Sequence, residues 1–332
     1  MDTVSVTVKF DRMLEIKEIE KIESYRFIKV SRGKRELDKS IFKISYPKFI
    51  GENNATLITN KEDVLKCNKR FVEILKEIRP NDMMTLNINR IDIPITYIMP
   101  ENKSFTQYKS MFYLLAKIYE KRVGKECGTK GIIDLKENEF QTVVYADAKN
   151  VNDYNCKVVF YDQHARYKDT YGGNIEELVK KHPDLNRRMR IEVSKKINRK
   201  SMELGKFGEF DLLGEYNEEF MRYTLDKLFN VDILWNEMEE QKSKWKIWFN
   251  AKIPNFVGKG LWEVIKEEDM YEPMRSVMTE LNLEKKNFEA RITSLRKELK
   301  RIETRENRMI IDLYDEVLKI RSSIAMMLTY YK

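Results

Sequence analysis

The sequence predicts an α+β protein: a mainly antiparallel sheet with flanking helices in residues 1–200, and an all-helical domain in residues 201–332. In the first 200 residues, strand patterns outnumber and surround two helix patterns, whereas only helix patterns follow. The chain has only 12 glycines and 7 prolines in 332 residues, which disfavours tight-turned all-β folds. We therefore expect a sheet domain with flanking helices, followed by a helical domain.

Six segments have the composition of β-strands. The first shows the clearest alternation, since Val4, Val6 and Val8 recur with period two. β-branched and aromatic residues dominate most of the others. The predicted strands cover 4–10, 41–44, 83–98, 140–148, 156–162 and 189–196.

Two helices are expected between these strands. The first covers 61–79, with Asn60 as its N-cap and Pro80 as its stop. The second covers 104–122 and begins at Ser104, with an apolar stripe that marks its buried face.

Helical patterns continue beyond residue 200. Residues 216–230 are amphipathic, and 242–249 mix lysine with tryptophan, which fits either a helix with a buried aromatic face or a surface that stacks single-stranded bases. Residues 281–302 carry a heptad seam, and 310–327 repeat apolar residues at similar spacing. These two runs predict a helical hairpin within one chain, with a homodimeric coiled coil through 281–328 as the alternative.

The charge is unevenly distributed. The chain has 62 Lys and Arg against 54 Asp and Glu, a formal charge of +8. Residues 149–200 alone hold thirteen basic and seven acidic side chains. A positive field of this kind attracts the phosphates of nucleic acids, so the charge predicts a polyanionic partner.

Several classes of protein are excluded by what the sequence lacks. The only histidines, His164 and His182, cannot form a His-x-His metal pair, and no GxSxG turn or glycine-rich phosphate loop occurs. Three scattered cysteines indicate a reducing cytoplasm rather than a disulfide framework. We expect neither a signal peptide nor a membrane span.

The candidate site comes from two similar strand triplets, Arg90-Ile91-Asp92 and Arg190-Ile191-Glu192. Alternation on a strand puts each arginine and carboxylate on one face and the isoleucine on the other. Between the triplets, Lys157 and Tyr161 share a face of the predicted strand 156–162. If the three strands are neighbours, Asp92, Glu192 and the Tyr161 hydroxyl converge.

Such a cluster suits one kind of chemistry. Two carboxylates are hard oxygen ligands of the type that Mg²⁺ or Mn²⁺ prefers. A phenol beside a cation can act as a nucleophile towards phosphate, and this reaction needs no histidine.

The order of these motifs resembles that of rolling-circle replication initiators, both the plasmid Rep_trans type and the gene II/X replication proteins of filamentous phages. Their pattern is approximately RID, YxKxxE and R[FIV]E, and the resemblance covers about residues 85–196. It implies that Tyr161 nicks one strand of an origin that is single-stranded at the nick, with Asp92 and Glu192 as ligands of Mg²⁺ or Mn²⁺. A helicase is a further implied partner. Six side chains are the expected DNA contacts: Arg90, Lys157, Arg166, Lys168, Arg190 and Lys195.

The chain departs from the family pattern after the tyrosine. Gln163 and Arg166 stand where the family has Lys and Glu, while Tyr167 and Tyr171 are rival nucleophiles. One alternative is therefore a catalytically degenerate protein of the same fold that binds an origin without cutting it. Another is a structural protein whose function lies in the helical region after residue 260.

Overall fold

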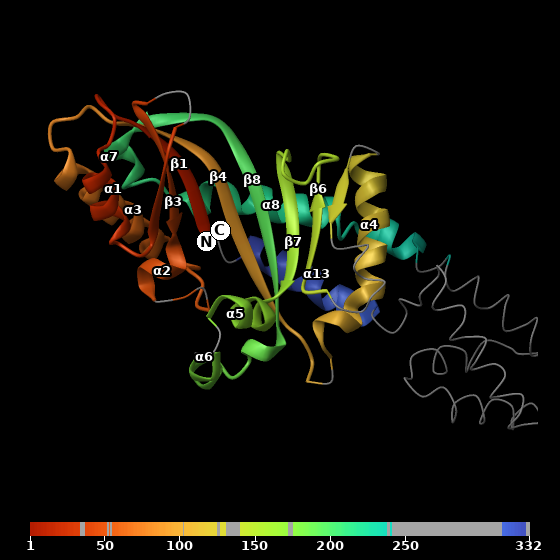
Figure 1. Ribbon diagram of the computed structural model, residues 1–332. Helices are drawn as coiled ribbons and strands as arrows, with labels where there is room; N and C mark the ends of the chain where they lie inside the picture. The colour runs from red at the N-terminus through yellow and green to blue at the C-terminus, as the bar shows by residue number, and fades with distance from the viewer. Residues whose placement is uncertain are drawn as a thin grey trace, which may run out of the picture.

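The computed structural model describes residues 1–33, 37–51, 53, 55–101, 103–124, 127–130, 140–171, 175–237, 240 and 314–329. An eight-stranded sheet forms its centre, in the order β2-β3-β1-β4-β8-β7-β6-β5, with helices packed against it (Figure 1). Every neighbouring pair of strands is antiparallel. The predicted α+β class, with a mainly antiparallel sheet and flanking helices, is confirmed.

The strands follow the alternating segments of the sequence closely. The predicted strand 156–162 is β7, and 189–196 lies within the longer β8. The strands are β1 Thr3–Lys9, β2 Ile28–Arg32, β3 Lys39–Ser45, β4 Thr85–Ile98, β5 Gly128–Lys130, β6 Thr142–Ala146, β7 Cys156–Asp162 and β8 Arg188–Glu203.

Local capping defines where the main helices begin. The side chain of Asn60 accepts a hydrogen bond of 2.8 Å from the backbone N–H of Asp63, and Asp211 does the same for Gly214 at 2.9 Å. The helices are α1 Ile16–Glu23, α2 Tyr46–Ile50, α3 Lys61–Ile78, α4 Lys109–Val123, α5 Gln163–Tyr171, α6 Ile175–Lys181, α7 Leu204–Phe207, α8 Leu212–Lys227 and α13 Tyr314–Thr329, with 3₁₀ turns at Phe105–Tyr108 and Leu185–Arg187.

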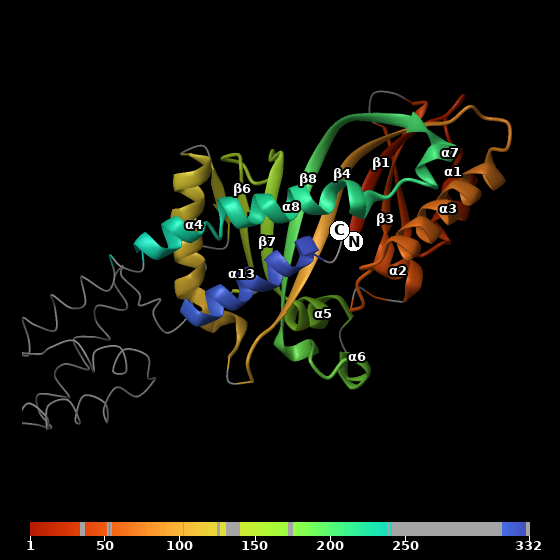
Figure 2. The ribbon, with the colours of Figure 1, turned by 180° about the vertical axis from the view of Figure 1, so that it is seen from behind.

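One face of the sheet carries the main hydrophobic core. In Figure 2, α8 and α13 cross in front of the central strands, α3 lies near one end of the sheet and α4 near the other. The inward side chains of β4, β7 and β8 join this core: Ile91, Ile93, Val158, Phe160, Ile191 and Val193. Because successive residues of a strand point to opposite faces, the polar residues between them lie on the other side of the sheet.

The described helices after residue 200, which include α8 and α13, share this core. β8 runs through residue 200 to Glu203, and the described part of the predicted second apolar run is α13. Ile320 and Ile324 of α13 are fully buried in the same core. The Asn217 side chain on α8 donates a hydrogen bond of 2.9 Å to the backbone carbonyl of Met327. This helix therefore packs against its own chain.

Two other predicted segments cannot be compared with the fold. The Lys/Trp segment 242–249 and the heptad seam 281–302 lie outside the described residues. In the part of the chain that is described, no helix has both the length and the apolar character that a membrane crossing requires.

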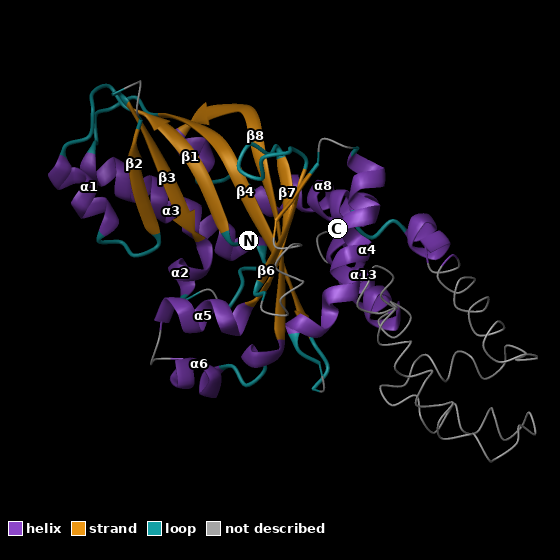
Figure 3. Cartoon of the chain, turned by 45° about the vertical axis from the view of Figure 1, so that its right-hand side comes forward, coloured by secondary structure: helices purple, strands orange, loops and turns teal. Residues whose placement is uncertain are grey.

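The helices α5 and α6 form a small separate unit beside the end of β7 (Figure 3). Tyr167 of α5 and Leu178 of α6 pack with Ala55 and Leu185 in a cluster distinct from the main core. The Asp162 carboxylate accepts a hydrogen bond of 3.0 Å from the backbone N–H of Ala165 and so begins α5 directly after the strand. This turn keeps α5 next to the last residues of β7.

Candidate functional site

The strands that carry the two Arg-Ile-acid triplets and the predicted tyrosine lie side by side as β4, β8 and β7. In the ladder, Asp92 faces Ser194, Glu192 faces Val159, and Tyr161 faces Arg190. We call the side of these strands opposite α8 and α13 the polar face. It is formed by Arg90, Asp92, Lys157, Tyr161, Arg190, Glu192 and Ser194.

Asp92 occupies the middle of the polar face and is only 3% exposed. Its carboxylate accepts hydrogen bonds from the Ser194 hydroxyl at 2.6 Å and from the Arg90 guanidinium at 2.8 Å. Burial nevertheless raises its pKa above the ordinary value, and the nearby charge of Asp2 raises it further. The two hydrogen bonds thus offset the cost of burying this charge only in part.

Glu192 is the second carboxylate, and its oxygen Oε2 lies 3.5 Å from the Tyr161 hydroxyl. Burial, followed by the charges of Asp92 and Asp2, raises the pKa of Glu192 to about 8. Burial and the Glu192 charge also raise the pKa of Tyr161 well above its ordinary value. The phenol and the carboxylate are therefore neighbours that both disfavour negative charge in the absence of a cation.

The predicted DNA contacts divide into two groups. The Arg166 guanidinium lies 4.4 Å from the centre of the Tyr161 ring, and Arg190, only 1% exposed, sits directly across the ladder from that tyrosine. Lys157 is half-buried on the same face. These residues join Arg90 around the two carboxylates.

The remaining two predicted contacts lie elsewhere. Lys168 is exposed on α5, beyond Arg166. Lys195 points to the helix-covered face of the sheet, where its ammonium pairs with Glu219 of α8. Strand alternation separates it from its neighbours Ser194 and Lys196, so the structure does not bring Lys195 to the cluster.

The carboxylate pair fits a small divalent cation. Mg²⁺ is commonly held by one or two carboxylates, with water and substrate phosphate completing the shell. Burial raises the pKa of both carboxyl groups, and the Asp92 charge raises the pKa of Glu192 further, as expected of neighbouring acids. Among the described residues no group of three or more His, Cys, Asp or Glu side chains gathers. Any ion here would thus be held by at most two carboxylates from the described part of the chain.

The rival tyrosines occupy other places. Tyr167 packs in the small cluster under α6, away from the carboxylates, and α5 ends at Tyr171. Gln163, which stands where the pattern of rolling-circle initiators has lysine, is buried at the first position of α5. The Tyr161 hydroxyl, by contrast with that of Tyr167, lies beside Glu192.

Three residues of the cluster do not come from the sequence analysis. Ser194 could be found from it, because alternation puts residue 194 on the same face as Glu192. Tyr154, whose hydroxyl lies 3.0 Å from Ser194 Oγ, precedes β7 in a loop. Asp2 reaches the site because its backbone N–H donates a bond of 3.1 Å to the Asp92 carbonyl oxygen. No local sequence pattern indicates that Tyr154 or Asp2 belongs to this site.

Comparisons with family models, curated proteins and solved structures found no match to this chain.

Proposed function

We propose that this protein initiates rolling-circle DNA replication by nicking and rejoining one strand of an origin through Tyr161. The observation that carries the proposal is the 3.5 Å separation of the Tyr161 hydroxyl from Glu192, with Asp92 on the neighbouring strand. The order of motifs along the chain, which resembles that of rolling-circle initiators, supports it. So does the ring of cations, Arg90, Arg166 and Arg190, around the carboxylates.

In the proposed reaction, the Tyr161 oxygen attacks the scissile phosphorus and the bond from phosphorus to the 3′ oxygen breaks. The 5′ phosphate stays on Tyr161 as an ester, and the free 3′ oxygen takes a proton from water, whose hydroxide is neutralised by the phenol proton once Glu192 releases it. The phenol proton passes to the ionised Glu192 carboxylate, which is within reach. Attack by a 3′ hydroxyl on the ester reverses the step and restores Tyr161.

The surrounding residues would orient the strand. Arg166 covers the Tyr161 ring from an exposed position, so displacement by the DNA backbone would open the phenol to the phosphate. Asp92 and Glu192 would hold Mg²⁺ or Mn²⁺, which when bound draws charge from the phosphate. Ser194 and Arg90 fix the Asp92 carboxylate through two hydrogen bonds.

The substrate would be origin DNA, single-stranded at the nick, and a helicase would continue strand separation. The cytoplasm is the proposed location, which three free cysteines support.

A second candidate function is origin binding without cleavage. It is favoured by the burial of Tyr161, 5% exposed with its pKa raised, and by Gln163 and Arg166 in place of the family's Lys and Glu. Such a protein would bind DNA regardless of divalent metal and of the Asp92→Ala substitution.

One experiment separates the two candidates. The protein is incubated with Mn²⁺ and a library of random single-stranded oligonucleotides labelled at the 3′ end, because the tyrosine ester retains the 3′ portion of the strand. We expect a labelled adduct that resists denaturation, its absence in Tyr161→Phe, and its persistence in Tyr167→Phe. If wild type binds the library and forms no adduct, the second candidate is correct; an adduct that survives Tyr161→Phe contradicts the assigned nucleophile.

A further inference from the structure

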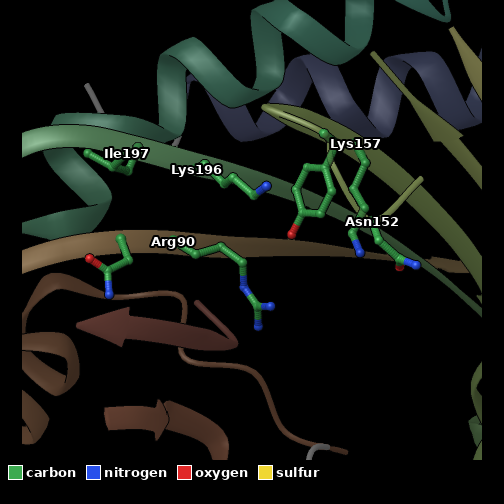
Figure 4. Close-up of a pocket in the computed structure, with 7 residues that line it drawn as sticks. Arg90, Asn152, Lys157, Lys196 and Ile197 are labelled. Carbon is green, nitrogen blue, oxygen red and sulfur yellow. The ribbon is translucent and has the colours of Figure 1, made fainter. Parts of the chain in front are cut away.

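A pocket of about 490 Å³ adjoins the carboxylates on the polar face. This volume is within the range of small-molecule sites, roughly 300–1,000 Å³. In Figure 4, Arg90 and Lys196 extend from neighbouring strands, while Lys157 and Asn152 line the other side. The polar lining comes from β4, β8, β7 and the loop before β7: Asn89, Arg90, Asn152, Tyr154, Lys157 and Lys196.

An irregularity in the sheet forms one wall of this pocket. Ile88 pairs with Lys200, yet Arg90 pairs with Lys196, so the β4–β8 ladder is interrupted between them. Asn89 lies at this interruption, and its side chain donates a hydrogen bond of 2.6 Å to the Thr7 hydroxyl. Bulges of this kind redirect side chains and are frequent beside functional sites. Here the bulge lets the consecutive residues Asn89 and Arg90 both line the pocket.

Three cationic side chains line the pocket, and only one of them has an ion-pair partner among the described residues. Arg90 pairs with Asp92, but neither Lys157 nor Lys196 has an ion-pair partner among the described residues. Burial and the adjacent charge of Arg90 lower the pKa of Lys157. Furthermore, Arg90 Nε is buried with no hydrogen-bond partner in the described part of the chain. Buried donors of this kind are costly unless a ligand satisfies them.

Tyr154 holds the two lysines in place. The Lys157 and Lys196 ammonium groups lie 4.4 Å and 4.9 Å from the centre of its ring. Because the Ser194 hydroxyl donates to Asp92, the Tyr154 hydroxyl donates to Ser194, 3.0 Å away. The ring thus presents cations to the pocket, and its hydroxyl joins the pocket to the carboxylate site.

We infer that this pocket binds a phosphate group of single-stranded DNA, separate from the phosphate that Tyr161 attacks. The inference rests on the proposed function in that it takes DNA as the substrate of the polar face, but it does not require cleavage. Contact with the partly exposed Arg90 guanidinium and the two ammonium groups would fix the path of the strand across β4 and β8. Inorganic phosphate has the same chemistry as a DNA phosphate, and the experiment distinguishes the two ligands.

The test measures DNA binding in the full-length Tyr161→Phe protein without divalent ions, so that failure of the nicking proposal cannot affect it. The affinity for fluorescent oligo(dT) is followed by anisotropy at several salt concentrations. We expect Lys157→Ala and Lys196→Ala each to weaken binding about tenfold. Each should also reduce the slope of log K against log salt by about 0.7, the value for one lost single-strand phosphate contact. The matched control is Lys76→Ala, which removes an equal charge from the exposed side of α3.

Equilibrium dialysis with labelled inorganic phosphate supplies the second arm. If the lysine variants lose phosphate binding but keep wild-type affinity for oligo(dT), the pocket serves a free anion and the DNA assignment is overturned. If they weaken oligo(dT) binding no more than Lys76→Ala, the inference is also overturned.

A pair of substitutions tests the role of the ring. Tyr154→Phe keeps the ring beside both lysines and should retain oligo(dT) affinity within about twofold. Tyr154→Leu removes the ring and should weaken binding to the level of the lysine variants. Equal effects of the two substitutions would contradict the role assigned to the ring, provided that circular dichroism shows both variants folded.

Discussion

The two faces of β4, β7 and β8 use neighbouring residues for opposite purposes. Phe160 is fully buried among Phe112, Tyr145 and Phe229, with ring centres 5.5 to 6.3 Å apart. The next residue, Tyr161, is also buried, but beside Glu192 and under Arg166. Thus one strand contributes to a hydrophobic core on one side and to a charged cluster on the other.

This difference shows where the protein gains stability and where it loses it. Apolar burial stabilises the helix-covered face, by about 25 cal/mol per Å² of area removed from water. On the polar face, burial raises the pKa of both Asp92 and Glu192, so their ionisation opposes folding. Sites that keep such unfavourable charges are candidates for function, since stability alone would not maintain them.

The largest expected effect comes from the helix-covered face. Phe160→Ala should reduce the free energy of unfolding by about 3–5 kcal/mol, because it leaves a cavity among three aromatic rings. Tyr161→Phe should change it by less than about 1 kcal/mol, because only one long hydrogen bond is lost. Urea denaturation measures both values. Similar losses in the two variants would contradict the division between the faces.

Divalent metal should stabilise the polar face selectively. At a Mn²⁺ concentration about a hundred times the Kd, the folded state gains about 2.7 kcal/mol. The melting temperature at about pH 8 should therefore rise by about 4 °C. The double variant Asp92→Asn, Glu192→Gln should show no shift, whereas Glu73→Gln on α3 serves as a control that keeps it. A shift of equal size in the double variant would exclude this carboxylate pair as the metal site.

The pH dependence of stability tests the charge on Glu192. Its pKa is raised to about 8 in the folded protein, so the neutral acid favours folding. That contribution is complete below the ordinary glutamate pKa and is lost as pH rises through about 8. Compared with Glu192→Gln in the absence of metal, wild type should lose on the order of 3 kcal/mol between about pH 5 and about pH 8. A constant difference between the two proteins would contradict the assigned burial of the charge.

The smallest effect is expected at Lys195, on the helix-covered face. Lys195→Ala removes an ion pair with the exposed Glu219, which is worth about 1 kcal/mol or less. It should leave oligo(dT) affinity unchanged, although the adjacent Lys196 lines the pocket on the other face. Anisotropy titration of the two variants side by side measures this contrast. If Lys195→Ala weakens DNA binding as strongly as Lys196→Ala, the two faces do not differ in DNA contact.

Much of this architecture was predictable from local patterns. The strand 156–162 has the observed bounds of β7, and the helix capped by Asn60 ends at Ile78, one residue before the predicted limit. Both predictions are close to the observed bounds because strand alternation and helix capping depend on residues that are neighbours in the sequence. The same alternation predicts that Arg90 and Asp92 share a face, and it would also have excluded Lys195 from the cluster.

Other features depend on contacts between distant segments. The heptad-like spacing of 310–327 predicts an apolar face but not its partner, which among the described residues is α8 and the sheet. The pocket at Asn89 requires a bulge between β4 and β8, and no residue pattern marks it. Asp2 and Tyr154 likewise reach Asp92 through the fold alone.

Peptide mapping of the covalent adduct tests the central claim most directly. Trypsin separates the three candidate tyrosines, because cleavage after Lys157, Arg166, Lys168 and Lys180 puts Tyr161, Tyr167 and Tyr171 in different peptides. After nuclease trimming of the DNA, mass spectrometry should find the added nucleotide mass on peptide 158–166, which contains Tyr161. Nucleotide mass on either of the other two peptides, or on none, would contradict the account.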